Sequence, residues 1–204
     1  MKNIRRFTLV ELLAVMALIA ILSGLGFGVY SYAKGKAKQS ATEALLKQIE
    51  AGLGAFNTKA GYYPRSNGGD FSVIKFTFAD DGTVASVNFG GETLTLETGT
   101  SLTKEQRMKN ERFEAFAKTV DMESIKNSLT EPDSSGNRTL IDAWGNKIYY
   151  RSPGQFKQGA YDLVSAGPDG GFGTEKKDSP AGITDLGKFR ETAGEHVCDD
   201  VFNF

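Results

Sequence analysis

Two groups of side chains have types and spacings that could do chemistry. Glu11 is the single charged residue within residues 7–33. A carboxylate in such an apolar run costs on the order of 3 kcal/mol to bury and normally has a charged partner. His196 and Cys198 could bind a soft metal ion, but a structural zinc site usually has four ligands. They also lie on a terminal tail, without the shaped pocket that nucleophilic catalysis needs, so no enzyme is predicted.

The element that must position Glu11 is an apolar run over residues 7–32. About 20 apolar residues, at ~1.5 Å each, cross the hydrocarbon core of a bilayer, so this run is long enough to span one. The basic leader, residues 1–6, is expected to stay cytoplasmic. One alternative is an ordinary signal anchor whose Glu11 reaches the interface. Another is a cleaved secretory signal peptide, although Glu11 and the lack of a small-x-small cleavage site argue against it.

The heptapeptide Phe7-Thr-Leu-Val-Glu11-Leu-Leu resembles the processing site of type IV pilins and type II secretion pseudopilins. In that family a prepilin peptidase removes a basic leader, and the new N-terminal residue, usually Phe, is N-methylated. The family's glutamate pairs with the terminal amine of a neighbouring subunit. The resemblance therefore implies cleavage between Arg6 and Phe7, methylation of Phe7 and a role for Glu11 in assembly. The family has Gly before the cut, where this chain has Arg6.

At residue 34 the pattern changes from apolar to amphipathic, and it stays amphipathic to residue 60. Apolar residues recur at the three- or four-residue steps of one helix face: Ala37, Ala41, Leu45, Ile49, Leu53 and Phe56. One helix is predicted from the apolar run to about Lys59, where the segment Ala60-Gly61-Tyr62-Tyr63-Pro64 ends it. Sustained heptads with charged flanks are missing, so this face is expected to pack on the chain's own head rather than in a coiled coil.

The globular head is expected to occupy residues 61–204. A three-stranded β-meander is predicted for residues 71–98, with a hairpin turn at Asp81-Gly82. The alternation of its first strand slips at Val73-Ile74. Compared with compact secretion pseudopilins, this meander resembles an insertion.

Two helices are predicted next, within residues 104–129. A capping box from Thr103 to Gln106 opens the first, and Asp121 caps the second. Met108, Phe113, Phe116 and Val120 mark one face of the first helix, and Met122, Ile125 and Leu129 are expected to be buried in the second. Residues 131–137 are predicted to form a loop.

Residues 142–186 carry a second set of motifs. The turn Asp142-Ala-Trp-Gly-Asn146 and the segment Tyr161-Asp-Leu-Val-Ser-Ala-Gly-Pro-Asp-Gly170 resemble the C-terminal half of the major secretion pseudopilins. Strands are predicted at residues 147–151 and 161–165. The resemblance implies an α+β pilin-like fold, in which a long N-terminal helix with a membrane-spanning first half packs on a C-terminal antiparallel sheet with short extra helices.

The glycine-rich, acidic loop that follows could bind Ca²⁺, which takes six to eight oxygen ligands. The corresponding loop of the major pseudopilins binds calcium, so the resemblance implies carboxylate ligands at Asp169 and Asp185, with Ser165 as a weaker candidate. Asp178 lies in a run that departs from the family pattern. The alternative is a solvated turn whose aspartates accept hydrogen bonds from local backbone N–H groups.

Composition limits the remaining possibilities. The net charge is −1 and the pI about 5.9, so no nucleic-acid partner is expected. Cys198 is the single cysteine, which excludes an intrachain disulfide. The head is long enough for one core of its own.

These observations predict a structural subunit of a type IV pilus-like or type II secretion pseudopilus filament. Its expected partners are identical or homologous pilin subunits, the prepilin peptidase, and the assembly platform with its ATPase. It would start in the inner membrane as a single-pass protein with its head outside the cytoplasm, then join a periplasmic or cell-surface filament. The alternative is a membrane-anchored binding or adhesin domain, calcium-dependent or not, that never polymerises.

Overall fold

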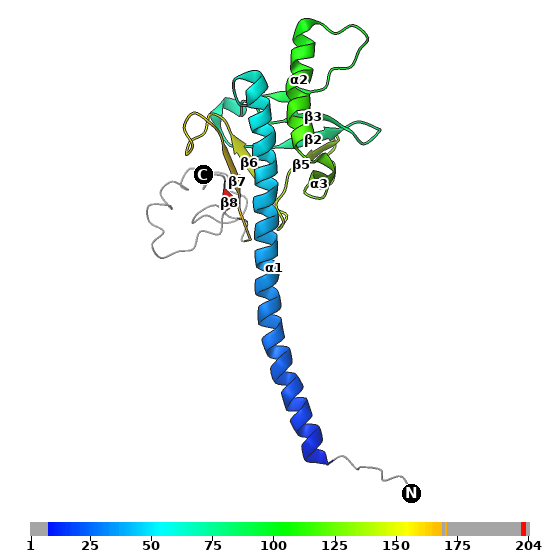
Figure 1. The fold of residues 1–204 in the computed structure, drawn as a ribbon, viewed down its shortest axis with the longest axis vertical. Helices are drawn as coiled ribbons and strands as arrows, with labels where there is room; N and C mark the ends of the chain where they lie inside the picture. Colours follow the sequence, from blue (N-terminus) through cyan, green and yellow to red (C-terminus); the bar gives the residue numbers. More distant parts are fainter. Residues whose placement is uncertain (1–7, 169, 171–200, 203–204) are drawn as a thin grey trace. The chain divides into compact units, whose positions relative to one another are not determined.

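The computed structural model in Figure 1 describes residues 8–168, 170 and 201–202, without the side chains of residues 23–28 and 201–202. The chain divides into two compact units, Met1–Lys38 and Gln39–Phe204. The first helix, α1 (Leu9–Ala60), has a continuous helical backbone. It ends where predicted, before Gly61, whose φ of +79° is a conformation that glycine adopts at little cost.

The first unit contains the start of α1. Within the described residues, no helix combines the length and the apolarity that crossing a membrane requires. The single-pass anchor at residues 7–33 therefore stays a prediction.

The second unit contains two antiparallel four-stranded sheets. Sheet A has the order β1 (Ser72–Val73), β6 (Ile148–Arg151), β7 (Asp162–Ser165) and β8 (Val201–Phe202). Sheet B has the order β4 (Thr93–Thr95), β3 (Val84–Asn88), β2 (Lys75–Phe78) and β5 (Asn137–Thr139). With α2 (Lys104–Thr119) and α3 (Met122–Lys126), they confirm the predicted α+β, pilin-like arrangement.

The predicted meander is split between the two sheets. β2, β3 and β4 pair in sequence as expected, but β1 leaves them and pairs with β6. Ile74, which lies between β1 and β2, is fully buried, so the slip in alternation marks the point where the chain changes sheets. Strand β5, part of which was predicted as loop, completes sheet B.

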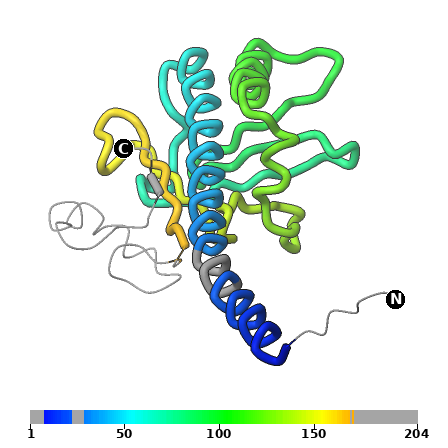
Figure 2. The backbone as a smooth tube through the Cα atoms, turned by 60° about the horizontal axis from the view of Figure 1, so that its bottom comes forward, coloured from blue at the N-terminus to red at the C-terminus, as the bar shows by residue number. Residues whose placement is uncertain are grey.

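The core of the second unit forms where α1 meets the sheets. In both Figure 1 and Figure 2, the later part of α1 lies between β6 and β7 on one side and α2 on the other. The α1 side chains buried there are those of Thr42, Leu45, Leu46, Ile49, Leu53 and Phe56. The prediction was wrong for Ala37 and Ala41, which are exposed. The buried face begins at Thr42, whose hydroxyl accepts a hydrogen bond from the backbone N–H of Ala143 at 3.2 Å.

The two short helices begin as predicted. Thr103 and Gln106 form the reciprocal capping box of α2, and the Asp121 carboxylate accepts hydrogen bonds from two backbone N–H groups of α3. Phe113 and Phe116 are buried, but Met108 is 44% exposed, because the core contacts of α2 come from its second half.

Tyr150 of β6 ties sheet A to the segment after α1. Its side chain is fully buried, and its hydroxyl donates a hydrogen bond to the carbonyl of Pro64 at 2.7 Å. Burial raises the pKa of Tyr150 because the phenolate would lose its hydration. The hydroxyl therefore remains a neutral donor at physiological pH.

Gly52 allows α1 and α2 to approach closely. A Cβ at this position would lie 2.4 Å from Val120 Cγ2 and 2.9 Å from Phe116 Cδ2, whereas a Cβ at Gly54 would meet nothing within 4 Å. We expect Gly52→Ala to destabilise the head by about 1–3 kcal/mol through overpacking. Gly54→Ala, the matched control, should be neutral or stabilising by up to about 1 kcal/mol. Urea unfolding of the full chain in detergent measures both, and equal stabilities of the two variants would contradict the close approach.

Candidate functional site

Glu11 closes a capping box at the start of α1. The backbone N–H and the hydroxyl of Thr8 both donate hydrogen bonds to Glu11 Oε2, at 2.8 and 2.9 Å. In return, the backbone N–H of Glu11 donates to Thr8 Oγ1 at 3.3 Å, and the Thr8 carbonyl accepts from Leu12 N. The Glu11 carboxylate of a single chain is thus held by its own helix start. The capping box was not predicted, although the Thr-x-x-Glu spacing in the sequence signals it.

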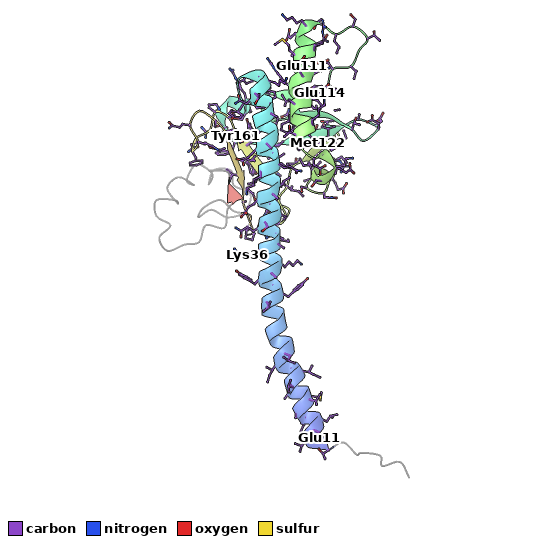
Figure 3. The ribbon with its side chains drawn as sticks, in the orientation of Figure 1. Glu11, Lys36, Glu111, Glu114, Met122 and Tyr161 are labelled. Carbon is purple, nitrogen blue, oxygen red and sulfur yellow. The ribbon has the colours of Figure 1, made fainter. Side chains whose placement is uncertain are left out.

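The helix around Glu11 exposes large apolar side chains on all sides (Figure 3). Between Leu9 and Leu22 their exposed fractions run from 51% to 75%: Leu9, Val10, Leu12, Leu13, Val15, Met16, Leu18, Ile19, Ile21 and Leu22. A helix that is apolar all round is stable only where other helices or lipid cover it. This segment is therefore an association surface with one carboxylate in it.

A buried polar network lies within the second unit. Asp142 is only 4% exposed, and its Oδ1 accepts hydrogen bonds from the backbone N–H groups of Trp144 at 2.9 Å and Asn146 at 2.8 Å. Its Oδ2 accepts the hydroxyl hydrogen of Ser165 at 2.6 Å. Asp142 thereby joins the turn at residues 142–146 to the end of β7.

The same network fixes the first residues after β7. Ser165 Oγ accepts a hydrogen bond from Gly167 N at 3.2 Å, and the side-chain amide of Asn146 donates to the Gly167 carbonyl at 2.6 Å. Ser165 is fully buried, and its hydroxyl keeps one lone pair beyond these two bonds. It can therefore serve as at most a minor metal ligand, while its observed bonds position the start of the loop.

Several residues that the sequence raised as candidates, whether predicted as site residues or not, lie outside the described residues. These are Arg6 and Phe7 of the processing site, Asp169 and Asp185 of the calcium loop, and the pair His196 and Cys198. Among residues 8–168, 170 and 201–202, no cluster of three or more His, Cys, Asp or Glu side chains could hold a metal ion. Calcium binding and the ligand role of Ser165 stay predictions.

Comparison with known proteins matches two parts of the chain to family models. A family model described as the prokaryotic N-terminal methylation motif matches residues 1–27, and one described as type II secretion system (T2SS), protein G, matches residues 107–184. The type II secretion system core protein G of Escherichia coli (strain K12) is 26% identical over 171 residues, which are 84% of this chain and 86% of that protein. These matches together support a pseudopilin family of the G type for this chain. No solved structure matches it.

The family assignment confirms the resemblance found in the two terminal motifs. Pseudopilins are structural proteins, so the prediction that the chain is not an enzyme is confirmed as well. In this pseudopilin the Asp142 network lies within the part that the protein G model matches, whereas β1 to β4 lie before it. Thr8 and Glu11 lie within the N-terminal methylation motif.

Proposed function

We propose that this chain is a structural subunit of a type II secretion pseudopilus, assembled from membrane-anchored monomers through α1. The observation that carries the proposal is the apolar, all-round exposed start of α1 with Glu11 as the single acid in it. Membership of the G-type pseudopilin family supports the same role. The subunit associates with other pseudopilins of the secretion machinery.

The proposed starting state is a single-pass monomer in the inner membrane, with residues 7–33 as its anchor and the head outside the cytoplasm. A prepilin peptidase removes residues 1–6, and Phe7 becomes the N-methylated end of the chain. The match of residues 1–27 to the methylation motif supports this step. The assembly platform and its ATPase then extract the subunit into a periplasmic filament.

Charge pairing explains why Glu11 is useful in such a filament. A carboxylate and an ammonium group each pay a large desolvation penalty in an apolar bundle, and they offset it only by meeting each other. In the proposed filament the Glu11 carboxylate meets the Phe7 amine of the adjacent subunit. A head-to-tail contact of this kind does not close on itself, so it generates a helical filament.

A filament assay tests this proposal. The pseudopilin is overproduced in cells that carry the peptidase and assembly machinery, and sheared or lysed fractions are inspected by electron microscopy and immunoblotting. We expect filaments that contain the chain. A chain that remains entirely as membrane-held monomer under these conditions would support the non-polymerising binding domain instead.

We also propose that the loop after β7 holds Ca²⁺ through Asp169 and Asp185, with Ser165 as a weaker ligand. A bound ion would neutralise the two carboxylates, and it would stabilise the loop where the loop joins the Asp142 network. Support comes from the fixed geometry of Ser165 and Gly167 at the start of this loop.

Calcium removal provides the test. At free Ca²⁺ about 100 times its dissociation constant, binding adds about 2.7 kcal/mol, which for a chain of this size raises the thermal midpoint by roughly 5–10 °C. We expect EGTA to abolish this rise, and Asp169→Asn or Asp185→Asn to abolish it in the presence of Ca²⁺. Asp178→Asn, in the run that departs from the family pattern, is the matched control. A rise of equal size in all three variants would contradict the assignment.

A further inference from the structure

A small cavity opens in the second unit, where the turn between β2 and β3 meets α3 and β5 (Figure 1). Its volume is about 280 Å³, just below the roughly 300–1,000 Å³ of pockets that hold whole cofactors or drug-sized ligands. The cavity therefore has the size for one side chain of a partner. The residues that line it are Phe78, Ala79, Asp80, Gly82, Lys126 and Arg138.

Arg138 is the lining residue whose hydrogen-bond donors are available to a ligand. It is half-buried, and its Cζ lies 5.8 Å from the centroid of the Phe78 ring. Among residues 8–168, 170 and 201–202, its guanidinium makes no ion pair and no hydrogen bond. A guanidinium held against a ring presents its N–H groups as a fixed fork, the geometry that binds a carboxylate through two parallel hydrogen bonds.

The charges of the lining favour a ligand with one negative charge. Lys126 and Arg138 carry two positive charges and Asp80 carries one negative charge, so the net charge of the lining is +1. Lys126 Nζ also lies 2.9 Å from Glu123 Oε2, but an exposed pair of this kind stabilises little and leaves the ammonium group able to meet a second carboxylate. A carboxylate balances the lining, whereas a phosphate group, with a charge of about −1.5 to −2, exceeds it.

The turn that forms one wall of the cavity is fixed by its own hydrogen bonds. Asp81 Oδ1 accepts from the backbone N–H and the hydroxyl of Thr83, at 2.9 and 2.6 Å. The backbone N–H of Gly82 donates to the Ala79 carbonyl at 2.9 Å. On the opposite wall, β5 holds Arg138 through its pairing with β2. Both walls are thus formed before a ligand arrives, so binding does not pay to order them.

We propose that this cavity binds the carboxylate of a glutamate or aspartate side chain on an exposed segment of a partner protein. Arg138 donates two hydrogen bonds to the carboxylate, Lys126 adds a second positive charge, and the methylene groups of the ligand contact Phe78. An ion pair near the surface alone stabilises little, so a free carboxylate ion is held weakly. A protein segment gains further contacts with the exposed rim at Asp80 and Gly82.

A nuclear magnetic resonance titration of the full, isotope-labelled chain in uncharged detergent tests the proposal. The probe is the capped peptide Gly-Ser-Glu-Ser-Gly, and the same peptide with a central glutamine is its control. We expect the glutamate peptide to shift the backbone amide signals of Ala79, Gly82 and Arg138 in a saturable way. The glutamine peptide should bind roughly fivefold to tenfold more weakly, because it lacks the charge that strengthens hydrogen bonds to arginine. Sodium acetate and inorganic phosphate, titrated separately, should both bind more weakly than the glutamate peptide.

Two variants change the affinity for the glutamate peptide in opposite directions. Arg138→Gln should weaken binding roughly tenfold, whereas Arg107→Gln, which removes the same charge from an exposed position on α2, should leave it unchanged. Asp80→Asn removes the acid of the lining and should strengthen binding by roughly twofold to fivefold, because it removes a repulsion of the ligand carboxylate. Asp80 is exposed, so this variant tests the site without disturbing the contact between Arg138 and Phe78.

Equal affinities of the two peptides would overturn the proposal, and so would wild-type affinity in Arg138→Gln or weaker binding by Asp80→Asn. Acetate that binds as tightly as the glutamate peptide would overturn the choice of a protein segment. Phosphate that binds more tightly would overturn the choice of a carboxylate. The titration needs no filament, so its outcome is separate from that of the proposed function: a chain that forms filaments but does not distinguish the peptides leaves only this site wrong.

Discussion

Glu11→Gln subunits are expected to reach the membrane with a folded head and yet fail to enter filaments. Glutamine keeps the size of the side chain but removes the charge, so the adjacent Phe7 amine is left unpaired in an apolar bundle. An unpaired charge there costs on the order of 3 kcal/mol, which is more than a hundredfold in each subunit addition. Immunoblots of sheared filaments against membrane fractions measure the loss.

The same substitution separates two roles of Glu11. Glutamine also completes a capping box, so Glu11→Gln preserves the contacts that hold Thr8 at the helix start. If Glu11 served only as a cap, filaments of this variant would form normally, and that result would contradict the charge-pairing account. Glu43→Gln, which changes an exposed acid on the same helix, is the matched control and should assemble.

The Asp142→Ala variant should lose more of the free energy of unfolding of its head than any variant in which an exposed acid is replaced. The change removes the acceptor of two partly buried backbone N–H groups and of the buried Ser165 hydroxyl. Each donor left unsatisfied costs about 1–3 kcal/mol, so we expect a loss of about 3 kcal/mol or more in the free energy of unfolding. Trp144, the single tryptophan, lies in this turn and reports urea unfolding by its fluorescence.

A double-mutant cycle isolates the contact between Asp142 and Ser165. Ser165→Ala alone should cost less than Asp142→Ala, and the double variant should lose clearly less than the sum, because both changes remove the same hydrogen bond. Asp133→Ala is the control, since its exposed carboxylate also accepts backbone N–H groups, those of Ser135 and Asn137. Strict additivity in the cycle would contradict the network.

Local patterns in the sequence were enough to predict the helices. The end of α1 at Ala60 follows from Gly61, and the caps of α2 and α3 follow from Thr103 and Asp121. These features depend on neighbours within four residues, so composition and spacing reveal them. The capping box of Thr8 and Glu11 is equally local and was missed only because Glu11 was interpreted through its charge.

Sheet partners could not be predicted in the same way. The slip at Val73-Ile74 was visible in the sequence, but the pairing of β1 with β6 depends on residues more than 70 positions away. Strand β5 is polar and therefore carries no apolar alternation, and β8 lies in a tail beyond the family motifs. The buried hydrogen-bond network of Asp142 was likewise not predicted, because the bond between Asp142 and Ser165 joins two motifs that lie apart in the sequence.

The most direct measurement is the intact mass and N-terminal sequence of subunits taken from assembled filaments. The account predicts a chain that begins with N-methylated Phe7, because the amine of this residue is the proposed partner of Glu11. Filament subunits that still carry residues 1–6, with no free amine at Phe7, would contradict it.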